Sequence, residues 1–278
     1  MPFTKTKNID FTIQDNKIIL SPDYLKKNLW RFKKITGSRL FNVLGYNSLC
    51  STFKTWCMMV NIYYEEMDET LAAAGNIIEP KIRTWVENKI QKKFLSYDPK
   101  KVNFDIFKDN EVFGGIPDGE ILDANSMSDN DPSILEIKTT SIDSFEYKKI
   151  NHVFILQKDA NNNPIVKSVG TKKQKWYDQN NKIQIPHEYL FQLGLYCYLR
   201  NKTQGLFAIC FLETQDYVAP EQCNINERDI ELVDFKIDLN KFQKYIEAAQ
   251  EWFFNHVKTG ISPEMNEEDK LFVKDLLG

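Results

Sequence analysis

Three charged residues, Asp118, Glu136 and Lys138, have the types and spacing of a hydrolytic site. Residues 134–138 alternate between apolar and charged side chains, which places Glu136 and Lys138 on one face of an expected strand. Residues 111–122 are predicted to form its partner, and the turn-forming residues 123–132 predict a hairpin that brings Asp118 near Glu136. Two converging carboxylates suit Mg²⁺ or Mn²⁺, and an adjacent lysine can orient or deprotonate an attacking water. Such a site could hydrolyse a phosphodiester.

The same residues also have a simpler explanation. Glu-x-Lys on one strand face is common as a solvated charge pair, and Pro117-Asp118-Gly119 is an ordinary turn sequence. The rest of the chain therefore has to decide between a site and a surface.

The elements around this hairpin follow from hydrophobic periodicity and capping residues. A helix over about 72–90 carries Glu79, and Pro80 is expected near its start or at a kink just after Glu79. A helix over 186–200 carries Gln192 among apolar neighbours, where a buried amide needs a polar partner. The other expected strands and helices are strands at 11–13, 17–20, 205–213 and 233–238, and helices at 21–32, 36–44, 52–67, 239–258 and 269–277.

The order of these elements and four separated motifs resemble a known superfamily. Gly115-Ile-Pro-Asp118 followed by Leu135-Glu-Ile-Lys138 resembles the signature of the PD-(D/E)xK nucleases. Ile35-Thr-Gly-Ser38, Gly75-Asn-Ile-Ile-Glu79 and Phe191-Gln192 are similar to motifs of the YqaJ-type viral recombinases, which are related to lambda exonuclease. The resemblance spans residues 30–200. It implies an α/β (α+β) fold with a PD-(D/E)xK restriction-endonuclease-like core of order α-β-β-β-α-β, a central mixed sheet flanked by helices, and an N-terminal helical region.

The resemblance also implies roles for individual residues. Asp118, Glu136 and the backbone carbonyl of Ile137 would hold a first Mg²⁺ or Mn²⁺, and Glu79 would bind or support a second ion about 4 Å away.

Lys138 would act on the attacking water, and Gln192 would help to position the water or the lysine. Arg31 and Ser38 would anchor a 5′-terminal phosphate, to which a guanidinium can make two charge-assisted hydrogen bonds. The long segment 141–185 departs from the family pattern and leaves strand polarity and processivity open.

Composition is that of an ordinary globular protein: 278 residues, 42% hydrophobic and 27% charged. We expect one nuclease domain over 1–278, with an N-terminal helical part (1–70), a catalytic core (71–215) and a C-terminal part of strand and helices (216–278). No apolar run is long enough for a membrane span, so we expect no membrane association and a cytoplasmic location. The five cysteines favour free, buried thiols over an iron–sulfur cluster.

Charge is distributed unevenly along the chain. Residues 137–182 hold nine lysines against four acids, whereas residues 213–278 hold seven basic against fifteen acidic residues. Lys172, Lys173 and Lys175 precede Trp176, a mixture of charge and aromatic ring that is typical of nucleic-acid contacts. A solvated surface loop would show the same composition.

We therefore expect a metal-dependent deoxyribonuclease, a 5′-to-3′ exonuclease on double-stranded DNA ends in phage-type recombination. The alternatives are a restriction-like or structure-specific endonuclease on the same core, and a DNA-binding protein that lacks catalysis. By resemblance, DNA is the expected partner, and a single-strand annealing protein and a homo-oligomer are further candidates.

Overall fold

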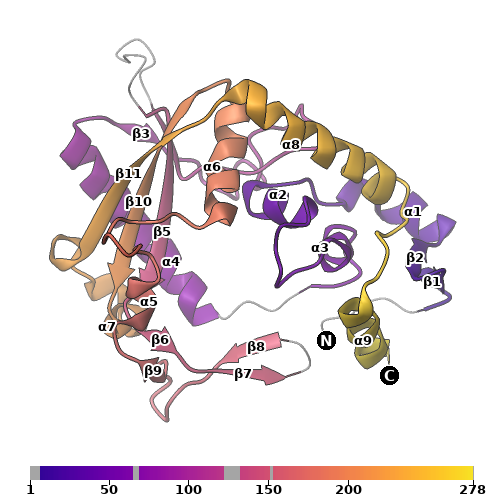
Figure 1. Ribbon diagram of the computed structural model, residues 1–278, viewed down its shortest axis with the longest axis horizontal. Helices are drawn as coiled ribbons and strands as arrows, with labels where there is room; N and C mark the ends of the chain where they lie inside the picture. The colour runs from indigo at the N-terminus through magenta and orange to yellow at the C-terminus, as the bar shows by residue number, and fades with distance from the viewer. Residues whose placement is uncertain (1–6, 65–68, 122–131, 151–152, 278) are drawn as a thin grey trace.

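A five-stranded mixed sheet forms the centre of the protein (Figure 1). The computed structural model describes residues 7–64, 69–121, 132–150 and 153–277. The strand order is β11-β10-β5-β4-β3, in which β5 and β10 are parallel and all other neighbours are antiparallel. The bounds are β3 Phe94–Leu95, β4 Gly119–Ile121, β5 Ile134–Ser141, β10 Gln204–Leu212 and β11 Asp229–Lys236.

One helix covers each face of this sheet. Helix α4 (Glu69–Ile90) buries Ala74, Ile78, Ile82 and Val86 against one face. Helix α6 (His187–Leu199) buries Leu193, Tyr196 and Cys197 against the other and forms part of the connection that parallel strands β5 and β10 require. Together with β3, β4, β5 and β10, these helices give the order α-β-β-β-α-β, which confirms the expected core.

The N-terminal and C-terminal segments pack together beside the sheet around a second apolar core (Figure 1). Ser21 caps α1 by accepting from the Tyr24 amide, as its sequence predicted. Helix α8 crosses from the sheet to this unit. The bounds are β1 Phe11–Gln14, β2 Lys17–Leu20, α1 Pro22–Asn28, the 3₁₀ turn η1 Leu29–Arg31, α2 Gly37–Val43, α3 Thr52–Met59, α8 Leu239–Trp252, a π-helical turn η5 Phe253–Lys258 and α9 Glu267–Leu277.

Segment 111–118 is not the strand that was expected. It contains Gly115 at φ +125° and Pro117, neither of which suits a regular ladder. Its backbone instead pairs with the N-terminal unit: the Ile35 amide donates to the Val112 carbonyl, and the Gly114 amide donates to the Ile35 carbonyl. Of the described residues in this segment, only Gly119–Ile121 joins the sheet, as β4, and its antiparallel pairing with β5 confirms the hairpin. Residue 122 and residues 123–131 of the predicted turn lie outside the described residues.

Two helix predictions also needed correction. Helix α3 ends at Met59, because Asn61 takes the left-handed conformation (φ 61°) and turns the chain; residues 65–67 of the predicted helix lie outside the described residues. Pro80 does not lie near the start of its helix, which was one of the two expected positions, because α4 begins eleven residues before Pro80 and continues past it. The burial of its apolar face outweighs the roughly 3 kcal/mol cost of an internal proline.

Residues 141–185 form more structure than a loop. Two antiparallel pairs, β6 with β9 and β7 with β8, are followed by the short helix α5. Trp176 lies buried and stacks on Tyr189, with ring centroids 5.8 Å apart, so it is not available to bases as the sequence suggested. The bounds are β6 Ser144–Phe145, β7 Tyr147–Ile150, β8 Val153–Leu156, β9 Val166–Ser168 and α5 Thr171–Gln174.

All five cysteines are free thiols, and four of them are buried. A search of the described residues finds no helix with the length and apolar character needed to cross a membrane.

Candidate active site

The short strand β4 leaves a gap in the sheet beside β5. Its pairing with β5 stops at Gly119 and Leu135, so Ile137 has no backbone partner on that side. The Asp118 carboxylate fills this position and accepts a hydrogen bond from the Ile137 amide at 2.7 Å. In an antiparallel strand the amide and carbonyl of one residue point the same way, so the Ile137 carbonyl also faces the gap. The structure therefore brings Asp118 and that carbonyl to one place.

Glu136, Lys138 and Gln192 form a closed hydrogen-bonded triangle on the α6 face of β5. Lys138 Nζ lies 2.8 Å from Glu136 Oε1 and donates to Gln192 Oε1 at 3.0 Å. Gln192 Nε2 donates to the same Glu136 oxygen at 2.6 Å. Lys138 Nζ also lies 4.4 Å from the centre of the Tyr189 ring, a cation–π contact. The half-buried glutamine thus has the polar partners that its sequence context required.

Glu79 reaches the gap from α4 and is held there by Arg83. The Arg83 Nη2 atom lies 2.7 Å from Glu79 Oε1, and Arg83 Nε donates to the Asp118 backbone carbonyl at 2.9 Å. Arg83 therefore ties the helix to the hairpin. We had not singled it out from the sequence, although its position four residues after Glu79 is the spacing of helical ion pairs.

Burial raises the pKa of all three carboxyl groups. For Glu136 burial and the neighbouring Asp118 raise the pKa to about 8, and for Glu79 the same two causes raise it to about 7. Burial also raises the pKa of Asp118, against the opposing effect of Lys138. Burial alone would lower the pKa of Lys138, but the Glu136 and Asp118 carboxylates raise it above its ordinary value. The lysine is therefore an ammonium within a cluster that holds protons near neutral pH.

The donor set fits a hard divalent cation. Glu136 Oε2 is buried and has no hydrogen-bond partner among the described residues, an arrangement that costs free energy unless another group binds it. Oxygen ligands are those that Mg²⁺ and Mn²⁺ prefer. Among the residues that the structure describes, no three side chains of His, Cys, Asp or Glu are grouped as a metal site. A cation would therefore need the Ile137 carbonyl and water in addition to Asp118 and Glu136.

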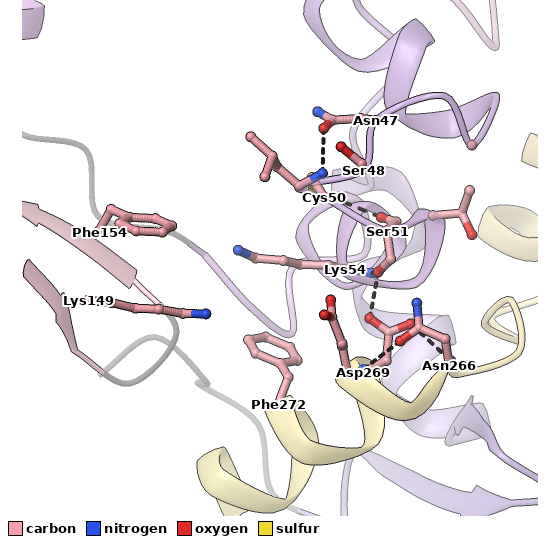
Figure 2. Close-up of a pocket in the computed structure, with 14 residues that line it drawn as sticks. Asn47, Ser48, Cys50, Ser51, Lys54, Lys149, Phe154, Asn266, Asp269 and Phe272 are labelled. Carbon is pink, nitrogen blue, oxygen red and sulfur yellow. Dashed lines mark hydrogen bonds between the residues drawn. The ribbon is translucent and has the colours of Figure 1, made fainter. Parts of the chain in front are cut away.

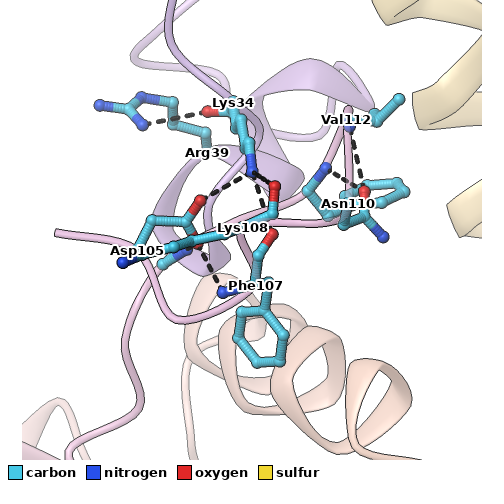
Figure 3. Close-up of polar contacts among 9 residues, drawn as sticks. Lys34, Arg39, Asp105, Phe107, Lys108, Asn110 and Val112 are labelled. Carbon is cyan, nitrogen blue, oxygen red and sulfur yellow. Dashed lines mark hydrogen bonds and ion pairs between the residues drawn. The ribbon is translucent and has the colours of Figure 1, made fainter. Parts of the chain in front are cut away.

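A network behind the hairpin fixes the path of the chain into Asp118 (Figure 3). Lys34 Nζ pairs with Asp105 Oδ2 at 2.7 Å and donates to the Phe107 and Lys108 carbonyls at 3.0 and 3.3 Å. The second Asp105 oxygen accepts from the Gly115 amide at 3.1 Å. Gly115 has no room for a side chain, because a Cβ would lie 2.7 Å from the Tyr196 hydroxyl.

The candidate DNA contacts lie apart from this cluster. Lys172 and Lys173 donate their amides to the Ile142 carbonyl, just beyond the end of β5, and Glu136 lies six residues before it, about 20 Å along an extended strand. Lys173 pairs with Asp229, and Lys175 is exposed.

Arg31 is exposed and stacks on Trp30, with 4.8 Å between its Cζ and the ring centre. Ser38 is exposed, and its hydroxyl lies 3.1 Å from that of Thr36. Neither residue contacts the carboxylate cluster through any described hydrogen bond or ion pair.

A cavity of about 710 Å³ lies elsewhere, between the α2–α3 loop, α9 and the β7–β8 hairpin (Figure 2). Lys54 and Lys149 point into it from opposite sides. Its buried carboxylate, Asp269, is already engaged by Ser51 Oγ at 2.6 Å and by the Asn266 amide at 3.1 Å. The Asp269 carboxylate is therefore occupied by contacts within the protein, whereas Glu136 Oε2 in the β5 site has no hydrogen-bond partner among the described residues.

Comparison with known proteins identifies the family of the chain. Residues 28–201 match the YqaJ-like viral recombinase domain. Two mycoplasma relatives are uncharacterised: protein MG373 of Mycoplasma genitalium is 52% identical over 277 residues, covering 99% of both chains, and its Mycoplasma pneumoniae homolog is 49% identical, covering 97% of this chain and 96% of its own.

Among solved structures, LHK-Exo in complex with dAMP aligns with a TM-score of 0.50 at 11% identity, covering 90% of this chain and 97% of the other. LHK-Exo is an alkaline exonuclease from Laribacter hongkongensis, and another structure of it aligns with a TM-score of 0.47 at 10% identity, covering 92% of this chain and 98% of the other. At these identities the likeness is one of fold.

Proposed function

Because the chain belongs to the YqaJ-like viral recombinase family, we propose that it is a metal-dependent deoxyribonuclease, specifically a 5′-to-3′ exonuclease on double-stranded DNA ends. One observation carries the nuclease part: the Glu136 carboxylate, beside Asp118, has one oxygen engaged by Lys138 and Gln192, and its other oxygen is buried without a hydrogen-bond partner among the described residues. The exonuclease part is supported by the fold shared with LHK-Exo.

In this proposal Asp118, Glu136 and the Ile137 carbonyl hold Mg²⁺ or Mn²⁺, and Glu79 supports a second ion. The bound cation supplies Lewis-acid stabilisation of the phosphate and a more acidic water.

The side chains of the chain itself perform the remaining tasks. Lys138, which the neighbouring carboxylates keep protonated despite its burial, donates hydrogen bonds that orient the attacking water and offset the charge developing on the phosphate. Gln192 holds Lys138 and Glu136 at a fixed separation. Arg83 fixes Glu79 relative to Asp118. Each group is thus preorganised by a contact that already exists in the protein.

Digestion of linear duplex DNA, labelled separately at its 5′ and 3′ ends and accompanied by a closed circle, tests the proposal. We expect loss of the 5′ label in Mg²⁺, an intact circle, and no reaction in chelator. Cleavage of the circle would instead identify an endonuclease on the same core. Binding of DNA without products in Mg²⁺ or Mn²⁺ would refute the nuclease proposal.

The proposed 5′ anchor has its own test. Arg31→Ala should slow digestion of 5′-phosphorylated ends more than that of 5′-hydroxyl ends, because only the former present a terminal phosphate to the guanidinium. An equal effect on both substrates would remove Arg31 from this role.

A further inference from the structure

The β7–β8 hairpin forms one wall of the cavity of about 710 Å³ (Figure 2). Lys149 on β7 and Phe154 on β8 are directly opposite each other in the strand pairing, so their side chains lie on the same face of the hairpin. Both residues line the cavity, whereas the next pair, Lys148 and Ile155, lies on the other face. The hairpin therefore presents a cation and an aromatic ring side by side to the cavity.

Both of these side chains are accessible. Phe154 is 63% exposed, and an exposed aromatic ring has apolar surface that a partner can bury. Lys149 is also exposed, and its Nζ lies 5.8 Å from the centre of the Phe154 ring. Because neither side chain belongs to the buried core, either can be replaced without disturbing the fold.

The opposite wall repeats this combination. Lys54 of α3 points into the cavity toward the hairpin, with its Nζ 5.8 Å from the centre of the Phe272 ring of α9 (Figure 2). Two carboxylates of α9 also line the cavity: Asp269, whose contacts are described above, and the exposed Glu268. An anion is therefore expected on the hairpin side of the cavity, where Lys149 lies.

These groups suit a single strand of nucleic acid. Lysines attract the backbone phosphates, and aromatic rings stack on bases whatever their sequence. In a duplex the bases are already stacked in pairs, so only an unpaired strand can use an aromatic ring in this way. The proposed exonuclease produces such a strand, because each nucleotide that it removes leaves the complementary nucleotide unpaired.

We propose that the cavity between the β7–β8 hairpin, α3 and α9 binds single-stranded DNA, namely the strand that remains when its complement has been digested. The proposal rests on the proposed exonuclease function, and it gives a role to part of the segment 141–185, which departs from the family pattern. Phe154 stacks on a base, while Lys149 and Lys54 bind neighbouring phosphates. None of the described residues that line the cavity belongs to the carboxylate cluster, so the strand bound here is not the strand that is cut.

Fluorescence anisotropy in chelator, where no cleavage occurs, tests the site with an oligothymidylate of about 12 nucleotides and a blunt duplex of the same length. We expect Phe154→Ala to weaken binding of the single strand about tenfold, because it removes a stacking contact. Lys149→Gln should weaken it about fivefold at about 0.1 M salt and reduce the slope of log Kd against log salt by about 0.7, the value for one phosphate contact on a single strand. Binding of the duplex should change by no more than about twofold in either variant.

The other face of the same hairpin supplies matched controls. Lys148→Gln removes the same charge one residue away, and Ile155→Ala removes apolar surface from the neighbouring position on β8. Each should leave the Kd for the single strand within about twofold of the wild-type value. Equal effects of Lys148→Gln and Lys149→Gln would show that only the net charge of the hairpin matters, and would overturn the proposal.

Two other results would also overturn it: wild-type affinity of both Phe154→Ala and Lys149→Gln for the single strand, or an equal loss of affinity for the duplex. The site and the proposed function fail separately. A protein that binds the oligothymidylate through these two residues but digests no duplex in Mg²⁺ or Mn²⁺ refutes the exonuclease. An enzyme that digests DNA while neither substitution changes binding of the single strand refutes the site alone.

Discussion

Metal binding by the carboxylate cluster should tighten as pH rises, because protons and the cation compete for the same oxygens. With a pKa raised to about 8, Glu136 is protonated in most molecules at neutral pH, and binding must release that proton. Displacing one such proton makes the apparent Kd about 25-fold larger at about pH 6.5 than at about pH 8.5. If Glu79, with a pKa of about 7, must also lose its proton, the ratio becomes about 100-fold.

Isothermal titration calorimetry of the metal-free protein with Mn²⁺ measures both quantities. Titrations at two pH values give the ratio of Kd values, and buffers with different ionisation enthalpies give the number of protons released. Glu136→Gln should abolish tight binding and proton release, whereas Glu146→Gln, on an exposed carboxylate, should behave as wild type. A Kd that is constant over this range, with no proton released, would show that the burial argument for the cluster is wrong.

Three further substitutions test separate parts of the site. Lys138→Ala should reduce the cleavage rate by roughly 1000-fold or more, as expected for the loss of a contact to the transition state, while calorimetry still detects Mn²⁺ binding. A variant that cleaves DNA normally would contradict the proposed role of Lys138 in orienting the attacking water. Arg83→Met removes the cation paired with Glu79, so the pKa of Glu79 should rise above about 7 and the pH–rate profile should shift to higher pH. An unshifted profile would show that Arg83 does not control the protonation of Glu79. Gly115→Ala should lower the free energy of unfolding by about 3 kcal/mol, because the new Cβ strains the backbone and overlaps with the Tyr196 hydroxyl. Gly170 also has a positive φ but open space around it, so Gly170→Ala should lower the free energy of unfolding by only about 1 kcal/mol. Equal losses for the two variants in urea denaturation would refute the steric argument.

The hairpin that carries Asp118, Glu136 and Lys138 could be predicted because its evidence is local. Alternation in residues 134–138 placed Glu136 and Lys138 on one face, and the turn-forming residues after Leu122 predicted the return to β5. The order of helices and strands gave the fold, which family and fold comparisons confirm.

Other features depend on contacts between distant segments. The path of residues 111–118 is set by hydrogen bonds to Ile35, about eighty residues earlier, so strand propensity alone was misleading. Trp176 looked like an exposed aromatic beside lysines, but Tyr189 and the sheet cover it.

The close packing of Gly37 on Gln192 has a consequence for dissecting the protein into parts. Helices α2 and α6 lie in contact over their lengths, and the backbone at Gly37 touches the residue that holds Lys138 in place. Tyr196, on the same helix, packs against Gly115 in the loop before Asp118, because a Cβ at Gly115 would lie 2.7 Å from its hydroxyl. A shortened enzyme that starts at residue 71 would keep every proposed metal ligand and still lose the surface against which α6 is aligned, so a minimal nuclease made from this chain has to include residues 35–44.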